Sequence, residues 1–160
     1  DTQLKGYSMS RSIRFIAGFL FLGACLPLTA YAAPAALTPP DLPGVTVVTA
    51  AQARDLMAKG VLIVDTRVAS EYVEQRINGA VSIPYKEKSA KAPDFDGRLD
   101  RFDLGKLPRD KSTPVIFYCN AGECWKSYKA SKTALKAGYT KVYWLRGGIP
   151  EWKNNGLPVE

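Results

Sequence analysis

VIFYCNAGECW, at residues 115–125, is the stretch that decides the fold. Its first four residues are apolar and include β-branched side chains, which is typical of a strand buried on both faces of a sheet. The next six residues are mostly small or polar and predict a tight loop, and a helical pattern then runs from Trp125 to Lys136 and ends at Gly138. A buried strand that passes through a short loop into a helix is the repeating unit of a parallel α/β sheet.

The same alternation of strands and helices continues on both sides of this stretch. Short apolar runs predict strands over 45–48, 62–64, 80–83 and 142–145, and helices are expected over 50–59, 70–74 and 150–154. Thr49 is the expected N-cap of the first helix, and Gly60 its end. Residues 85–108 are expected to form a charged loop with some helix. Together these elements predict an α/β fold with a central, mostly parallel five-stranded sheet and helices on both faces.

The first part of the chain has the pattern of an export signal. Met9 is the expected start, so residues 1–8 are interpreted as vector-derived or upstream sequence. Residues 9–32 combine a short basic region, an apolar run too short to span a bilayer and small residues before a cut after Ala32, which predicts a signal peptide. We therefore expect a periplasmic or secreted protein whose mature form has no transmembrane segment. A lipoprotein box ending at Cys25 leaves a lipid anchor there as the alternative.

The composition of the chain after residue 32 indicates where the domain begins and which class of ligand it binds. Residues 33–43 are rich in proline and are interpreted as a linker, which places the domain at 44–160. The formal net charge of the whole chain is +7 at pH 7, and its basic residues are spread along the sequence. A dispersed basic surplus favours small anionic substrates over nucleic acid.

The chain has no histidine, which restricts how a nucleophile can be activated. Ser-His and Cys-His catalysis are excluded, and a zinc site is disfavoured. Cys119 follows the buried strand and opens a loop in which Ala121 and Gly122 let the backbone curl, so that successive amides point inward and bind an anion. Together with the helix N-terminus, these amides would lower the pKa of the Cys119 thiol. Lys126 and Lys129, on the first turns of the helix, would add positive charge.

Two interpretations remain open for each cysteine of this loop. Cys119 is either the reactive thiolate or a buried structural thiol. Cys124 either resolves an intermediate by forming a disulfide with Cys119 or fills space beneath the helix. A curled loop and an oxidising compartment favour the disulfide.

Four motifs, in order along residues 61–160, resemble the signatures of the rhodanese-like domain family. Tyr118-Cys119 with Gly122 is similar to the active loop of that family, and the Cys124-Trp125 ending is similar to a subset of its exported, single-domain members. The other motifs are Asp65-Thr66-Arg67 with Glu71-Tyr72, the run from Ile77 to Pro84, and Leu145-Arg146-Gly147-Gly148 with Trp152 and residues 156–159.

The resemblance implies a sulfurtransferase that works through a persulfide on Cys119. Sulfur from a small anionic donor such as thiosulfate would pass to Cys119 and then to a thiol or cyanide acceptor, without a metal or an organic cofactor. Asp65 and Arg67 would support the site, with Arg67 paired to Glu71 or to another carboxylate. The implied substrate-binding loop comprises Asn120, Ala121, Gly122, Glu123, Cys124 and Trp125.

The loop departs from the family at the position where many members have an arginine. Cys124 occupies this sixth position, and we expect Lys126, Lys129 or Arg146 to supply the missing positive charge. Two functions remain beside sulfur transfer: a periplasmic thiol–disulfide redox protein that uses both cysteines, and a non-catalytic binding module. Four residues separate the two cysteines, instead of the two of thioredoxin-like motifs, which counts against the redox protein.

Overall fold

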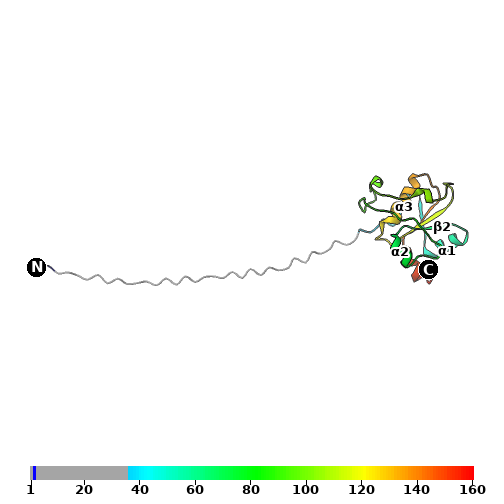
Figure 1. Cartoon of the computed structure of the whole chain (residues 1–160), viewed down its shortest axis with the longest axis horizontal. Helices are drawn as coiled ribbons and strands as arrows, with labels where there is room; N and C mark the ends of the chain where they lie inside the picture. Colours follow the sequence, from blue (N-terminus) through cyan, green and yellow to red (C-terminus); the bar gives the residue numbers. More distant parts are fainter. Residues whose placement is uncertain (1, 3–35) are drawn as a thin grey trace. The chain divides into compact units, whose positions relative to one another are not determined.

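The computed structural model describes residue 2 and residues 36–160, and the predicted signal peptide and Cys25 lie outside this part of the chain. Residues 36–160 form one unit in which strands and helices alternate (Figure 1). Within the described residues, no helix has both the length and the apolar character that crossing a membrane requires. The elements are β1 (Val45–Val47), α1 (Ala50–Ala58), β2 (Leu62–Asp65), α2 (Ala69–Glu74), β3 (Val81–Ser82), the 3-10 turns η1 (Gly97–Leu99) and η2 (Leu104–Lys106), β4 (Val115–Tyr118), α3 (Trp125–Lys136), β5 (Val142–Leu145) and α4 (Gly148–Asn154).

The five strands form one parallel sheet in the order β1-β5-β4-β2-β3. The predicted five-stranded α/β sheet is therefore confirmed, and every pairing in it is parallel rather than only most of them. In the register, Tyr118 of β4 lies between Asp65 of β2 and Leu145 of β5. Because parallel strands end at the same edge, the residues that follow them, Thr66, Cys119 and Arg146, emerge together, and ligands of such sheets bind at this edge.

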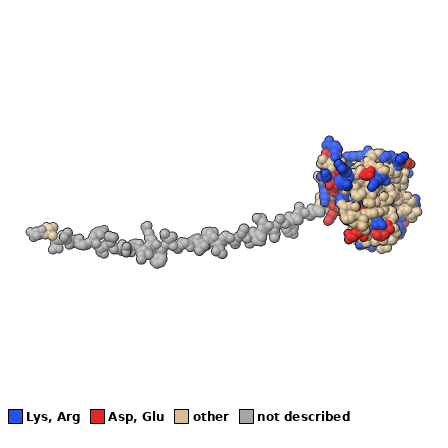
Figure 2. All heavy atoms as spheres, in the orientation of Figure 1, with Lys and Arg blue, Asp and Glu red and all other residues tan. Residues whose placement is uncertain are grey.

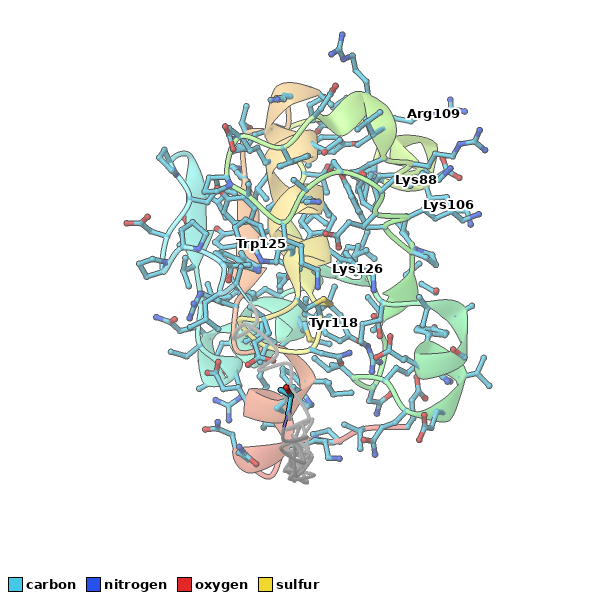
Figure 3. The ribbon with its side chains drawn as sticks, turned by 90° about the vertical axis from the view of Figure 1, so that its left-hand side faces the viewer. Lys88, Lys106, Arg109, Tyr118, Trp125 and Lys126 are labelled. Carbon is cyan, nitrogen blue, oxygen red and sulfur yellow. A yellow bond between two sulfur atoms is a disulfide. The ribbon has the colours of Figure 1, made fainter. Side chains whose placement is uncertain are left out.

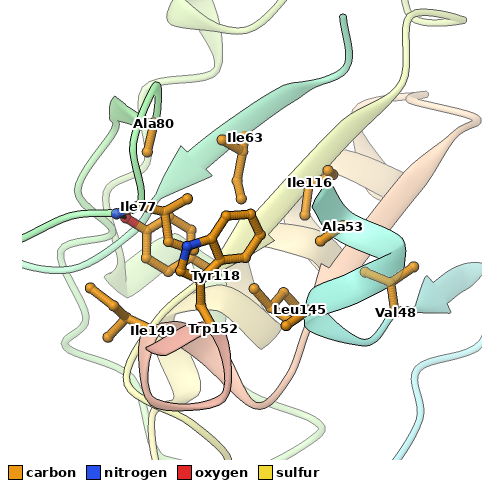
Figure 4. Close-up of a cluster of buried hydrophobic side chains, with 11 residues drawn as sticks. Val48, Ala53, Ile63, Ile77, Ala80, Ile116, Tyr118, Leu145, Ile149 and Trp152 are labelled. Carbon is orange, nitrogen blue, oxygen red and sulfur yellow. Dashed lines mark hydrogen bonds between the residues drawn. The ribbon is translucent and has the colours of Figure 1, made fainter. Parts of the chain in front are cut away.

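Successive residues of the central strand β4 point into two different hydrophobic cores. Ile116 lies in the core that also contains Ala53 of α1 and Trp152 of α4 (Figure 4). Its neighbour Phe117 lies in the core on the other face, with Ala130 of α3. This burial on both sides explains why β4 is a continuous apolar run and confirms that helices cover both faces.

Local signals set the ends of the helices near the predicted positions. The Thr49 hydroxyl accepts a hydrogen bond from the Gln52 amide at 3.3 Å, and the Gln52 side chain accepts one from the Thr49 amide at 2.9 Å. This capping box starts α1 at the expected N-cap, and Gly60, with φ +84°, follows its C-terminus. α4 begins at Gly148, two residues earlier than the expected start at Pro150, which lies in its first turn.

Residues 36–43, here called the N-terminal strap, contact the domain, although their proline-rich sequence predicts a linker. Thr38 is 2% exposed and Leu42 is 5% exposed. Leu42 shares a third hydrophobic core with Trp125, Tyr128 and other aromatic side chains. The strap therefore packs on the start of α3, the helix that follows the cysteine loop.

Candidate active site

The two cysteines of the loop are joined by a disulfide at the carboxyl end of β4 (Figure 3). The Cα atoms of Cys119 and Cys124 are 6.1 Å apart, within the range of about 4.4–6.8 Å usual for disulfides. Cys119 is 1% exposed, whereas Cys124, the N-cap residue of α3, is only partly buried. The curled loop thus brings the second sulfur against the first, as the redox interpretation requires.

Two loop carbonyls accept hydrogen bonds from outside the loop, and four consecutive loop amides have no acceptor in the described part of the chain. The Cys119 carbonyl accepts a hydrogen bond from the Ile149 amide at 3.0 Å, and the Gly122 carbonyl accepts one from the Thr38 amide at 2.8 Å. Among the described residues, the amides of residues 120–123 have no hydrogen-bond acceptor. The C=O and N–H of a trans peptide point in opposite directions. The Asn120 and Glu123 amides, which share peptides with these two carbonyls, therefore point away from Ile149 and Thr38. Successive free amides of this kind bind anions.

Gly148 lets α4 approach the loop closely enough to hold it. Its φ of +60° lies in the left-handed region, and a Cβ there would collide with the Cys119 carbonyl oxygen and lie 2.6 Å from the Ala121 nitrogen. Only glycine fits both the conformation and the contact. Ala121 itself has φ +64°, so the loop is curled at a residue that carries a side chain. The motif Leu145-Arg146-Gly147-Gly148 singles out Gly148 in the sequence, but only the structure shows that Gly148 supports the loop.

Arg146 lies beside the loop, and the strap holds its guanidinium. Its Nη2 donates to the Thr38 carbonyl at 2.8 Å, and its Nε donates to the Pro39 carbonyl at 3.0 Å. A Cβ added at Gly122 would lie 3.0 Å from Nη2, which places the guanidinium against the loop. The Thr38 hydroxyl donates to the Gly122 carbonyl at 2.9 Å. Strap, Arg146 and loop therefore form one connected unit.

The strap also contacts Trp125, whose indole is 2% exposed and whose Nε1 donates to the Ala36 carbonyl at 2.7 Å. At the other end of the loop, the Asn120 side chain donates to the Glu71 carboxylate of α2. Glu123 is exposed. The strap contacts could not be predicted from the sequence, because a proline-rich segment carries no periodic pattern from which packing is inferred.

Of the two lysines proposed beside the loop, Lys126 is the less buried. It is partly buried on the first turn of α3, near the disulfide in Figure 3. The prediction for Lys129 is wrong, because its side chain is fully buried and its Nζ donates to the Glu87 carboxylate at 2.9 Å and to the Ser89 hydroxyl at 2.8 Å. Its Nζ is also 3.8 Å from the Asp100 carboxylate. Lys129 therefore anchors the segment 85–108 to α3 instead of facing the loop.

Asp65, Arg67 and Tyr118 form a buried network beneath the loop. Arg67 Nη2 donates to the Asp65 carboxylate at 2.6 Å, so its partner is Asp65 and not Glu71. The Tyr118 hydroxyl donates to the same carboxylate at 2.6 Å. Burial, followed by the charge and hydrogen bond of Asp65, raises the pKa of Tyr118 above its ordinary value. Tyr118 therefore stays neutral and serves as a fixed donor below the loop.

A pocket of about 690 Å³ lies at the carboxyl end of β3, and its lining combines the basic residues Lys86, Arg101 and Lys106 with the acidic residues Asp100 and Asp103. Figure 2 shows Lys and Arg side chains spread over the visible face of the domain with Asp and Glu among them. Within the described residues, no group of three His, Cys, Asp or Glu side chains is placed to hold a metal ion. The arrangement instead offers a thiol pair and an amide-lined loop.

Comparisons with known proteins agree with this geometry. The family model of the rhodanese-like domain matches residues 49–155. The chain is 31% identical over 99 residues to a sulfurtransferase of Allochromatium vinosum, covering 62% of this chain and 78% of that one. It is 32% identical over 112 residues to the chloroplastic thiosulfate sulfurtransferase 16 of Arabidopsis thaliana, covering 68% and 87%. A Bacillus halodurans crystal structure matches with a TM-score of 0.54 and 25% identity, covering 72% of this chain and 76% of that one. The chain therefore belongs to the rhodanese-like domain family.

Proposed function

We propose that this protein is a sulfurtransferase that carries sulfane sulfur as a persulfide on Cys119. The observation that carries the proposal is the position of Cys119 at the carboxyl end of β4, at the head of a loop whose amides 120–123 have no acceptor among the described residues. The names of the two sulfurtransferase relatives support the same chemistry. Lys126 and the charge of Arg146 would attract a small anionic donor such as thiosulfate.

The exchange needs only the thiolate and the loop. The Cys119 thiolate attacks the outer sulfur of thiosulfate, the sulfur–sulfur bond of the donor breaks, and sulfite leaves with the electron pair. The free amides stabilise the anionic donor and then the persulfide anion. A thiol or cyanide acceptor attacks the outer persulfide sulfur and regenerates the Cys119 thiolate.

The disulfide has to be reduced before this cycle begins, because Cys119 in the disulfide has no thiolate to offer. The chain has three cysteines, so Cys25→Ser in the full chain leaves only the two thiols of the loop. In that background we would measure thiocyanate formation from thiosulfate and cyanide, after reduction and removal of the reductant. Cys124→Ser, in which no loop disulfide forms, should turn over repeatedly. Cys119→Ser should form thiocyanate no faster than buffer, and equal rates in the two variants would refute the proposal.

A second candidate function, thiol–disulfide exchange with an outside protein, is favoured by the disulfide itself. The matched measurement is the reduction potential of the Cys119–Cys124 pair in a glutathione buffer. A redox protein would hold a defined potential and transfer its disulfide to a model dithiol. Such transfer without any sulfur transfer in the Cys124→Ser variant would make this function the better one.

We further propose that the protein is exported and cut after Ala32. The order of basic, apolar and small residues over 9–32 supports export, and disulfides persist in oxidising compartments such as the periplasm. The N-terminal residue of the protein recovered from a periplasmic extract tests the proposal. Alanine at residue 33 is the expected result, and a lipidated Cys25 would contradict simple cleavage.

A further inference from the structure

We propose that Cys124 resolves the Cys119 persulfide and releases its outer sulfur as sulfide, so that the protein reduces sulfane sulfur with its own two thiols. The proposal rests on the sulfurtransferase function above and adds a second activity to the same site. It also names the partner that the site requires, a dithiol reductant that returns the disulfide to two thiols.

The geometry that carries the proposal is the closeness of the two sulfur atoms. The loop brings Cys124 to bonding distance of the sulfur atom that carries the persulfide. Ala121, at φ +64°, makes the curl, and the Ala121 carbonyl accepts a hydrogen bond from the Cys124 amide at 3.1 Å. Cys124 is also the N-cap residue of the 12-residue helix α3, and its side chain makes no capping hydrogen bond. Once the disulfide is reduced, the Cys124 thiol therefore lies at a helix N-terminus, a position that favours a thiolate.

The step is balanced without any further oxidant. The Cys124 thiolate attacks the inner persulfide sulfur, which is Cys119 Sγ, and the bond between Sγ and the outer sulfur breaks. The outer sulfur leaves as hydrosulfide with that electron pair. Over both steps, thiosulfate and two thiols give sulfite, hydrogen sulfide and one disulfide. The two thiols are oxidised, the sulfane sulfur is reduced, and both thiol protons end on the sulfide.

The difference in exposure between the two cysteines determines how an outside dithiol resets the site. Cys119 is 1% exposed and Cys124 is partly buried, so an incoming thiolate reaches the Cys124 sulfur first. Attack there expels Cys119 as a thiolate, next to the free amides of 120–123. A leaving thiolate that is stabilised in this way departs faster. The same amides therefore assist both the loading of sulfur and the reopening of the disulfide.

The test is a single turnover with thiosulfate as the probe. The full chain with Cys25→Ser is reduced, freed of reductant under anaerobic conditions and mixed with thiosulfate. Free sulfide is then trapped with a bimane reagent, and the protein mass is measured in parallel. Wild type should release about one sulfide per chain and lose the mass of two hydrogen atoms, as the stoichiometry of the two exchange steps requires. Cys124→Ser should gain one sulfur atom and release no sulfide, and Cys124→Ala is its control for an altered fold.

The outcomes separate this inference from the function on which it rests. A stable sulfur gain in wild type, with no sulfide released, would overturn the role of Cys124 and leave the sulfurtransferase intact. No sulfur gain in either Cys124 variant, in protein whose circular dichroism is unchanged, would overturn both. Sulfide release that persists in Cys124→Ser would show that a different group reduces the persulfide, and would also overturn the proposal.

Discussion

Replacing Gly148 by alanine should loosen the cysteine loop. The same replacement at Gly156, which has a similar φ, measures the backbone strain alone. At φ +60°, a side chain costs about 1–2 kcal/mol of stability. The new Cβ would also collide with the Cys119 carbonyl oxygen, which accepts a hydrogen bond from Ile149 that is worth about 1 kcal/mol. Gly148→Ala should therefore lower the free energy of unfolding by about 2–3 kcal/mol.

Gly156→Ala is the control, because Gly156 has φ +67° and no atom within 4 Å of the added Cβ. It should show only the strain of about 1–2 kcal/mol. Urea unfolding of the reduced proteins, followed by tryptophan fluorescence, measures both. Because a displacement of about 1 Å at a reacting group costs about a hundredfold in rate, Gly148→Ala should also slow persulfide formation by up to that factor. Equal stability and equal rates in the two variants would refute the role assigned to Gly148.

Three further perturbations test other parts of the account. Thr38→Val removes the hydroxyl bond to the loop but keeps the amide bond, so it should cost about 1 kcal/mol in urea unfolding and Thr38→Ser should restore it; no loss would contradict the anchoring by the strap. Asp100→Asn should cost about 1–3 kcal/mol at neutral pH, because the buried carboxylate accepts hydrogen bonds from the Lys88 and Ser89 amides and from the Tyr85 and Ser89 hydroxyls, and an amide side chain cannot accept them all. The pKa of Asp100 is lowered: although burial alone raises it, hydrogen bonds from Ser89 and its neighbours prevail. The contribution of this carboxylate is therefore complete above its unfolded pKa of about 4 and should shrink as pH falls further, and a cost that does not change between pH 7 and acid would contradict this assignment. Reduction of the disulfide between Cys119 and Cys124 opens a closed loop of about six residues and should lower stability by about 2 kcal/mol, measured against the Cys124→Ser variant, which should not respond to reductant.

The sequence predicted the sheet well because each buried strand is a short, continuous apolar run. Residues 115–118 were expected as a strand, and β4 occupies those four positions between β2 and β5. The N-cap at Thr49 was equally readable, since a capping box uses residues only three positions apart. Because the strand was expected to end at Tyr118, Cys119 could be placed at the carboxyl edge of the sheet.

What escaped prediction depends on contacts between distant parts of the chain. Lys129 looks like a surface lysine near the loop, and only the fold shows that Glu87 and Ser89 enclose it. Thr38 reaches Gly122 across 84 residues, and no local pattern signals that contact. The difference in burial between the two cysteines also needed the structure. The sequence contains no signal that Cys119 is the more buried of the two.

Whether Cys119 carries transferred sulfur can be measured as the mass of the reduced Cys25→Ser, Cys124→Ser chain after incubation with thiosulfate. Removing Cys124 prevents both the disulfide and the resolving step, so any sulfur that is loaded remains in place. The account predicts a gain of one sulfur atom, located by peptide mapping to the fragment that contains Cys119 and abolished by Cys119→Ser. A folded chain that gains no sulfur, or gains it on a fragment without Cys119, would contradict the account.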